Sequence, residues 1–311
     1  MKIPQANLPK VAILRGGNVK RETSLSEGAL LLSSLSKIGY EPYDVLIEED
    51  GTWVHRGMPT DPHAVFTRVD GYVDTTRTNK EIYHDLASRM GIPDVLRGHE
   101  LPYDEDNETT FRILRQAGIA VPETAVIRAR GAVVDEHLYE LWRTMHTPLL
   151  VRSLSPQRSE SAKLVRSLET LRDTINSFLD KKEDVHILTY TDVPTYSIAV
   201  LPAYRGEPYY TPFPVFTKGT KGEVPHGASK LYGYTDGSPE DRIRIASLAQ
   251  EVAEALTIAT PVTVDIIKDK GTYKVVRVDV APSLRPEGRF LSSLATTGVD
   301  IGHYIHSKLF I

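Results

Sequence analysis

The sequence predicts an α/β protein whose N-terminal part is built around a parallel sheet. A short apolar strand, KVAILRGG (10–17), ends in a glycine pair, and the helical segment SLSEGALLLSSLSKIGY (24–40) follows it. Leucines recur at helical spacing along that segment, and Gly39 is placed to end the helix. A second strand, EPYDVLIEEDG (41–51), comes next. Strand, helix and strand within about forty residues imply parallel pairing through a right-handed crossover.

The remainder of the chain continues to alternate strands and helices. A helix over 106–118 has Asp106 as a candidate N-cap and Gly118 at its end. Residues 205–241 are rich in Gly, Pro and Lys, so we expect a long loop there. The other expected elements are a strand over 63–69, a helix over 80–93, a strand over 147–155, a helix over 167–180 with Ser167 as its cap, strands over 184–191 and 196–204, a helix over 239–256 and a hairpin within 265–288.

Composition excludes several classes of function. The chain has 311 residues, 41% of them hydrophobic and 25% charged, which is enough for two or three compact units. A formal net charge of −4 gives no global basis for nucleic-acid binding. Zero cysteines exclude disulfides and thiolate ligands. The first ten residues have no apolar stretch of the signal-peptide type, and no apolar run is long enough to span a bilayer. We therefore expect a cytoplasmic protein that binds neither nucleic acid nor membrane.

The hairpin carries the most informative polar residues. Asp265 lies near the end of its first strand, a Lys-Asp-Lys-Gly turn follows, and the second strand carries Arg277 and Asp279. Two acids facing each other across a hairpin suggest a divalent-metal site. Arg277 has the same strand parity as Asp279 and therefore lies on the same face.

Several strings along the chain resemble the D-alanine–D-alanine ligases of the ATP-grasp superfamily. They are VAILRGGNVKRETSLSEGALLLSSLSKIGYEPYDV, MGIP, FRILRQAGIAVPETAVI, SLETL, YSIAVL and VDVAPSLRPEG, in the family's order. The resemblance implies an ATP-grasp fold in three domains. These are an N-terminal Rossmann-like pre-ATP-grasp domain (1–102), a central lid domain (103–203) and a C-terminal ATP-grasp domain (204–311). It also implies a homodimer formed through the N-terminal domain.

The resemblance implies a reaction and a first-substrate corner. Ligases of this family use ATP with Mg²⁺ to make an acyl phosphate from one amino acid, which a second amine then attacks. Glu22, by resemblance, would bind the amino group of the first D-alanine, and Ser24 would lie beside it. Glu and Ser at a helix start are equally ordinary capping residues, so both interpretations of this pair stay open.

The family's metal positions are altered here. The family carries Arg-x-Asp on one strand and Glu-x-Asn on the next, whereas this chain has Thr263-Val-Asp265 and Arg277-Val-Asp279. Asp279 is a tolerable oxygen ligand in place of Asn. A guanidinium in place of the bridging glutamate cannot ligate a cation and repels it at close range. We therefore predict that Arg277 forms salt bridges with both Asp265 and Asp279; the alternative is that a slipped register turns Arg277 to solvent.

The family's phosphate, adenine and oxyanion positions also differ. Asn107 and Arg152 stand at the two phosphate-binding lysines, and of these Arg152 retains a charge. The loop over the phosphates, 153–165, contains no glycine. Ser283 stands where the family has a glycine whose N–H lies near the tetrahedral intermediate. Acids expected at the adenine strand are replaced by Leu188 and Thr189, and candidates for the closing loop are Lys218, Lys221, Lys230 and Tyr232.

Three functional hypotheses follow from this pattern. The first is a ligase-like ATP-grasp protein with lost or strongly impaired ligase activity that acts as a binding or scaffold protein. The second is an active ATP-dependent carboxylate–amine ligase, making D-alanyl-D-alanine or a related dipeptide for peptidoglycan, with Asp265 and Asp279 holding one magnesium ion and Arg152 a phosphate. The third is a sensor that kept a D-amino-acid or dipeptide pocket but not ATP.

Overall fold

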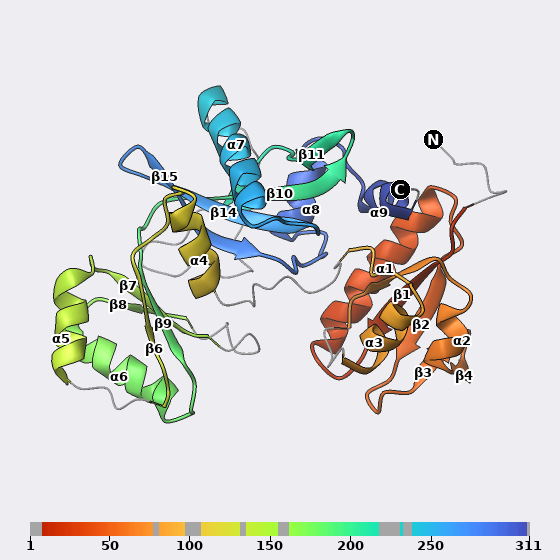
Figure 1. Ribbon diagram of the computed structural model, residues 1–311, viewed down its shortest axis with the longest axis horizontal. Helices are drawn as coiled ribbons and strands as arrows, with labels where there is room; N and C mark the ends of the chain where they lie inside the picture. The colour runs from red at the N-terminus through yellow and green to blue at the C-terminus, as the bar shows by residue number, and fades with distance from the viewer. Residues whose placement is uncertain are drawn as a thin grey trace.

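The chain folds around three β-sheets in the part that the structure describes. The structure is a computed structural model, and it describes residues 8–76, 81–96, 107–130, 135–154, 162–217, 231–232 and 238–309. Within these ranges the sheets follow one another along the chain as five, four and six strands. Figure 1 shows the first sheet at one end of the molecule, the four-stranded sheet at the other, and the six-stranded sheet between and above them.

The first sheet has the parallel core that the sequence predicts. Its order is β4-β3-β2-β1-β5, and β1 pairs in parallel with both β2 and β5. Helix α1 connects β1 to β2, helix α2 precedes β5 in the chain, and helix α3 follows it. The elements are β1 (Val11–Gly16), α1 (Arg21–Lys37), β2 (Tyr43–Ile47), β3 (Trp53–His55), β4 (Met58–Thr60), α2 (Pro62–Phe66), β5 (Gly71–Asp74) and α3 (Glu81–Arg89).

One element of this region differs from the sequence prediction. Residues 63–69 were expected to form a strand, but α2 covers most of them. The Asp61 side chain accepts hydrogen bonds from the backbone N–H groups of His63 and Ala64, and Pro62 stands in the first turn. An Asp cap followed by Pro is a helix-start signal, and it prevails over the β-branched and aromatic residues that follow.

The four-stranded sheet forms a separate layer with its own core. Its order is β6-β9-β7-β8, and its pairs are antiparallel. Helices α5 and α6 cover one face of it (Figure 1). Ser167 caps α6, as predicted, by accepting from the Thr170 N–H. The elements are α4 (Asn107–Gln116), β6 (Thr124–Ile127), α5 (Asp135–Thr144), β7 (Leu149–Ser153), β8 (Lys163–Val165), α6 (Leu168–Leu179) and β9 (Val185–Thr189).

The third sheet has the order β13-β12-β10-β14-β15, with β11 paired to β10. Part of the long loop expected over 205–241 is therefore strand. Tyr210 pairs with Leu201, and Phe216 with Tyr196, because aromatic side chains there favour pairing with β10. The elements are β10 (Thr195–Tyr204), β11 (Glu207–Tyr210), β12 (Val215–Thr217), β13 (Leu231–Tyr232), α7 (Pro239–Ala255), β14 (Val262–Asp269), β15 (Thr272–Asp279), α8 (Arg289–Ala295) and α9 (Ile301–Leu309).

The first and third sheets share one hydrophobic core. Leu35 of α1 and Ile13 of β1 belong to the same buried cluster as Leu201 of β10, Phe290 of α8 and Tyr304 of α9. Figure 1 shows α1 and α9 side by side. The chain thus brings the start of α1 close to the segment after β15, although more than 250 residues separate them. The three-domain division stays a prediction; its boundary at 203/204 falls within β10.

None of the helices in the described part of the chain has the length and apolar content that crossing a bilayer requires.

Candidate functional site

The β14–β15 hairpin places the predicted polar residues on one face. Thr263 lies opposite Asp279, and Asp265 lies opposite Arg277. A β-bulge follows, because Ile266 pairs with Val275 and leaves one extra residue on β15. The regular pairing before the bulge places both acids and Arg277 on the same side of the sheet, while alternate residues of β14 enter the core under α7.

Asp265 is buried and both of its carboxylate oxygens are engaged. Oδ1 accepts a hydrogen bond of 2.6 Å from the Ser197 hydroxyl on β10. Oδ2 forms a 2.6 Å ion pair with Nη1 of Arg289, the first residue of α8, and the Asp265 side chain is 5% exposed. The prediction that Arg277 bridges both acids is therefore wrong for Asp265. Arg289 approaches this carboxylate from a helix packed on the sheet, which a hairpin pattern does not reveal.

Asp279 forms the other half of the predicted arrangement. Its Oδ2 lies 3.2 Å from Nη2 of Arg277, so this salt bridge is confirmed. Its Oδ1 accepts a hydrogen bond from the Ala281 N–H. The Arg277 side chain is 45% exposed, so it lies partly in solvent while keeping its ion pair.

The residues at these positions do not fit a bound magnesium ion. Mg²⁺ needs oxygen ligands in a near-octahedral arrangement, and a protein carboxylate must be accessible to the ion in order to bind it. Each of the two acids here already pairs with an arginine. Among the described residues, no three His, Asp or Glu side chains lie together in an arrangement that could hold a metal. Two guanidinium groups supply the positive charge that a cation would bring, and they repel a second one.

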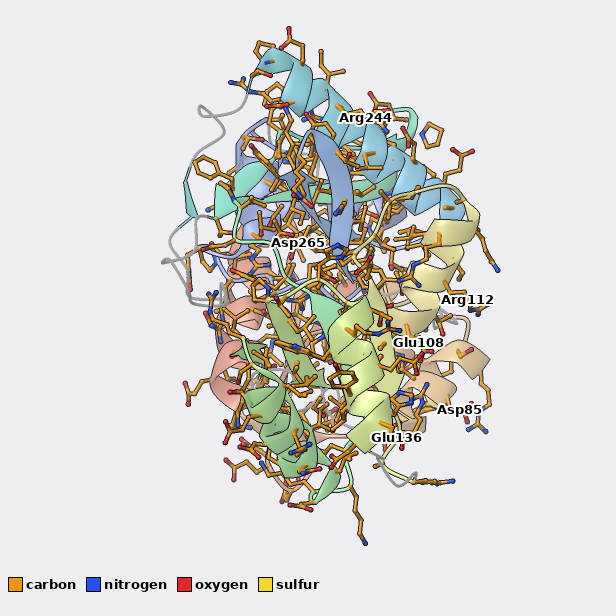
Figure 2. All side chains as sticks on the ribbon, turned by 90° about the vertical axis from the view of Figure 1, so that its left-hand side faces the viewer. Asp85, Glu108, Arg112, Glu136, Arg244 and Asp265 are labelled. Carbon is orange, nitrogen blue, oxygen red and sulfur yellow. The ribbon has the colours of Figure 1, made fainter. Side chains whose placement is uncertain are left out.

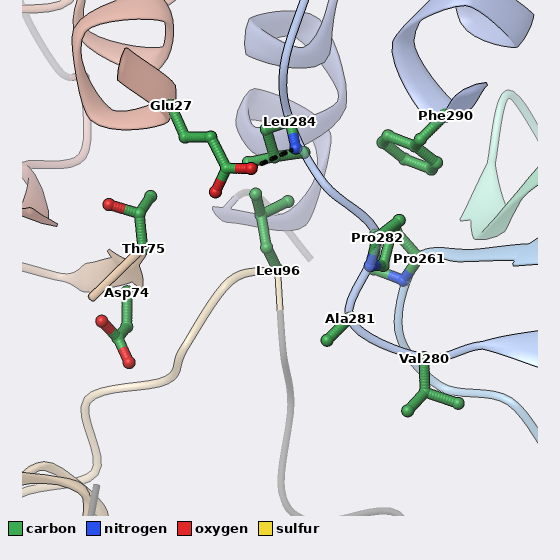
Figure 3. Close-up of a pocket in the computed structure, with 10 residues that line it drawn as sticks. All are labelled: Glu27, Asp74, Thr75, Leu96, Pro261, Val280, Ala281, Pro282, Leu284 and Phe290. Carbon is green, nitrogen blue, oxygen red and sulfur yellow. Dashed lines mark hydrogen bonds between the residues drawn. The ribbon is translucent and has the colours of Figure 1, made fainter. Parts of the chain in front are cut away.

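A pocket lies between the first sheet and the segment that follows β15. Figure 3 shows Glu27 of α1 with Asp74 and Thr75 on one wall, and apolar side chains on the other. Glu27 is 1% exposed, and its Oε1 accepts hydrogen bonds from the Ser283 hydroxyl at 2.6 Å and the Leu284 N–H at 2.9 Å. The apolar lining comprises Leu96, Pro261, Val280, Ala281, Pro282, Leu284 and Phe290.

Asp74 is the second carboxylate of this pocket, and neighbouring hydroxyls hold it. Its Oδ1 accepts hydrogen bonds of 2.7 Å from both the N–H and the hydroxyl of Thr76. Its Oδ2 accepts a 3.0 Å bond from the Tyr83 hydroxyl. Asp74 is 2% exposed, so its side chain lies in the wall of the pocket rather than in bulk solvent.

The predicted first-substrate pair divides between the interior and the surface. Ser24 is fully buried; its Oγ accepts from the Gly16 N–H at 2.8 Å and lies 3.0 Å from the Thr75 hydroxyl. Glu22 is exposed and is not among the described residues that line the pocket. Ser24 therefore supports the pocket wall through Thr75, and the ligand roles of both residues stay predictions.

The predicted phosphate-binding arginine contacts a buried histidine. Nη2 of Arg152 on β7 lies 3.3 Å from Nδ1 of His186 on β9, and a guanidinium only donates, so Nδ1 is the acceptor. Burial lowers the pKa of His186 to about 3, with further lowering by Arg152 and Arg115. The imidazole is thus neutral at physiological pH and adds no charge for a phosphate. Leu188, at the adenine strand, packs into a hydrophobic core.

Several predicted residues lie outside the described part of the chain. They are Asp106, most of the glycine-free loop over 153–165, Lys218, Lys221, Lys230 and the side chains of Asn107 and Tyr232.

Residues of the site that the sequence analysis did not indicate include Glu27, Asp74, Arg289 and Ser197. Glu27 had a readable signal, because Ser24, Glu27, Leu31 and Leu35 follow the buried stripe of α1. Arg289 had a weaker one. It stands in the first turn of α8, where the helix dipole disfavours a cation unless an anion lies nearby. Ser197 had none, since its role depends on the pairing of β10 with β14.

Comparison with known proteins shows which proteins the chain is similar to in sequence and in fold. No protein-family model matches the chain. A D-alanine–D-alanine ligase from Aquifex aeolicus is 23% identical over 203 residues, and the match spans 62% of this chain and 62% of that protein.

Solved structures agree over nearly the whole chain. The VanG D-Ala:D-Ser ligase of Enterococcus faecalis superposes with a TM-score of 0.79 at 16% identity, covering 98% of this chain and 99% of its own. The D-alanine–D-alanine ligase of Coxiella burnetii also gives 0.79, at 14% identity, covering 98% and 94%. The Bacillus anthracis ligase complexed with ATP gives 0.70 at 14% identity, covering 97% and 95%. The predicted fold and the resemblance to these ligases are confirmed, at a level of identity that marks a divergent chain.

Proposed function

From the premise that the chain has the ATP-grasp fold of the D-alanine–D-alanine ligases, we propose that it is a ligase-like protein without ligase turnover. On this proposal the protein acts by binding, as a scaffold or receptor built on the ligase fold. The proposal rests on the residues of the site and not on the fold, since one fold hosts functions that differ with the residues of its site.

The single observation that carries the proposal is the state of Asp265. By resemblance this residue would hold magnesium between the phosphates of ATP. Here one carboxylate oxygen accepts from Ser197 and the other pairs with Arg289, each at 2.6 Å. A magnesium ion would have to displace the partly buried Arg289 guanidinium before it reached the carboxylate. Because the buried ion pair is already compensated, that exchange leaves an arginine without its partner and is unfavourable.

The rest of the predicted nucleotide site offers little to offset this cost. Arg152 keeps its charge beside the neutral His186, but the adenine strand presents Leu188 to a hydrophobic core instead of an acid to the nucleotide. Removing one hydrogen-bond donor to the transition state typically costs an enzyme about 3 to 4 kcal/mol. Several simultaneous losses would lower the rate of acyl-phosphate formation below a useful turnover.

The test is a pair of measurements on the wild-type chain. Thermal shift and calorimetry with Mg²⁺ and ATP should give no saturable change, and a coupled ADP-release assay with D-alanine or D-serine should stay at background. The Bacillus anthracis ligase, which has been crystallised with ATP, is the positive control for both assays.

Two outcomes would overturn the proposal in favour of the alternatives. Micromolar binding of Mg²⁺-ATP together with amino-acid-dependent ADP release would make the chain an active carboxylate–amine ligase with rearranged ligands. Stabilisation by D-alanine or D-alanyl-D-alanine alone, without nucleotide, would make it a sensor.

The localisation, oligomeric state and partners of the protein are also proposals. We propose a cytoplasmic homodimer formed through the N-terminal part, with an amino-acid-sized ligand and with neither nucleic acid nor membrane as partner. Light scattering on the purified chain would measure its oligomeric state, and a monomeric mass at micromolar concentration would rule out the dimer.

A further inference from the structure

The contact between α1 and the segment after β15 joins distant parts of the chain through one carboxylate. Glu27 Oε1 receives the Ser283 hydroxyl at 2.6 Å and the Leu284 N–H at 2.9 Å (Figure 3). A hydroxyl and a backbone N–H that converge on one oxygen form the donor pair that proteins use for carboxylates and oxyanions. In this chain the oxygen they hold belongs to the protein itself.

The donor pair lies directly before a tight turn, Arg285 to Gly288. The Gly288 N–H donates to Arg285 O at 2.8 Å, which closes the turn. A Cβ on Gly288 would come within 2.9 Å of Arg285 O, so the turn requires glycine there. Arg285 adds a second link to α1, because its Nη2 donates to the Thr23 hydroxyl at 2.6 Å. Glu27 therefore binds a preformed donor pair rather than a loose loop.

The helix that carries Glu27 is equally fixed. The next residue, Gly28, lies against β1, where an added Cβ would stand 2.7 Å from the Cβ of Arg15. Leu31, one turn further, is fully buried in the core shared by the first and third sheets. The carboxylate thus enters the donor pair as a consequence of how α1 packs, and it cannot leave without a shift of the helix or a change of its own rotamer.

We propose that Glu27 is an intramolecular latch: its carboxylate fills a carboxylate-binding donor pair, Ser283 and Leu284, and closes the pocket to the carboxylate of a ligand for as long as it stays in place, so that an amino-acid ligand would have to displace it. Asp74 supports this reading of the pocket, because a ligand carboxylate would meet a second buried anion on the same wall. The proposal goes beyond the absence of ligase turnover and stands whether or not nucleotide binds.

Chemical rescue tests the latch. Glu27→Ala empties the donor pair and should lower the Tm by roughly 5 °C or more. Formate or acetate at about 100 mM should then restore about half of that loss, because the small carboxylate binds the folded state alone. The same salts should leave the wild type unchanged, and chloride at equal ionic strength should not rescue the variant. Glu49→Ala, which removes an exposed carboxylate outside the pocket, is the control and should behave as wild type.

A second measurement keeps the test decisive if Glu27→Ala does not fold. Glu27→Gln retains an accepting oxygen but loses the charge, so it should fold with a weaker latch. Hydrogen exchange of the Leu284 amide should then be at least about tenfold faster than in wild type, with exchange in the α1 interior unchanged. Equal exchange in both chains, or a Glu27→Ala variant stabilised by chloride as strongly as by formate, would show that Glu27 is not a latch.

Discussion

Replacing Arg289 by methionine tests whether an internal cation neutralises Asp265. Methionine keeps the length and apolar stem of the side chain but removes its charge. Asp265 would then retain the Ser197 hydroxyl and lose its ion-pair partner. The side chains of Asp265 and Arg289 are 5% and 19% exposed, so the carboxylate is buried and the guanidinium is partly buried.

The structure gives the size of the expected effect. Two unit charges about 4 Å apart at an effective dielectric constant of about 20 attract by roughly 4 kcal/mol. Removing one partner of a buried pair typically costs about 3 to 5 kcal/mol, because the remaining charge stays buried without compensation. We therefore expect Arg289→Met to lower the free energy of unfolding by about 3 kcal/mol, and the double variant Asp265→Asn/Arg289→Met to recover most of that loss.

Urea denaturation followed by circular dichroism measures these differences. The control is Arg112→Met, because Arg112 is exposed on α4, at the outer side of the molecule in Figure 2. That substitution should change the free energy of unfolding by less than about 0.5 kcal/mol.

A metal-binding experiment tests the same site in a variant that lacks both arginines. The variant Arg277→Glu/Arg289→Met removes both arginines that pair with the two acids and restores an acid at the bridging position. Millimolar Mn²⁺ should raise its Tm and leave the wild type unchanged. The reasoning would be refuted if Arg289→Met matched Arg112→Met in stability, or if Mn²⁺ stabilised the wild type and the Arg277→Glu/Arg289→Met variant equally.

Three further predictions rest on single contacts. Gly28→Ala should destabilise by about 1 to 3 kcal/mol, measured by urea denaturation, because the new Cβ would overlap the Arg15 side chain. His186, whose pKa burial lowers to about 3, stays neutral when folded but takes up a proton when unfolded below about pH 6.5. Stability should therefore fall with pH below that value, by about 2 to 3 kcal/mol between pH 7 and pH 4.5, and His186→Leu should abolish this part of the loss in urea titrations. Asp61→Ala should cost about 1 kcal/mol by removing the α2 cap, again measured with urea.

The fold could be predicted because its signals are local and apolar. The strand–helix–strand unit at the N-terminus and the hairpin of β14 and β15 each depend on short-range periodicity. The errors arose where one local signal had to be weighed against another. Residues 63–69 combine strand-forming residues with the Asp61 cap, and the cap determined the outcome.

The candidate site was less predictable because its contacts are long-range. Asp265 and Arg289 are 24 residues apart, and they meet only because α8 folds back onto β10 and β14. Glu27 and Leu284 are 257 residues apart, and they meet because α1 and the third sheet share a core. A resemblance to a family assigns roles to aligned positions, and it cannot supply a partner that the family does not have.

The geometry of β14 explains how the fold can persist while the chemistry changes. Val262, Val264 and Ile266 face the core under α7, whereas Thr263 and Asp265 alternate with them on the opposite face. Substitutions on the polar face leave the apolar packing intact, so metal ligands can be lost without loss of the sheet. The polar face must still satisfy its buried charges, because an uncompensated carboxylate would cost several kcal/mol. On the proposal that no cation neutralises Asp265, Arg289 is a requirement of stability rather than of catalysis, and it opposes the binding of a metal at this carboxylate.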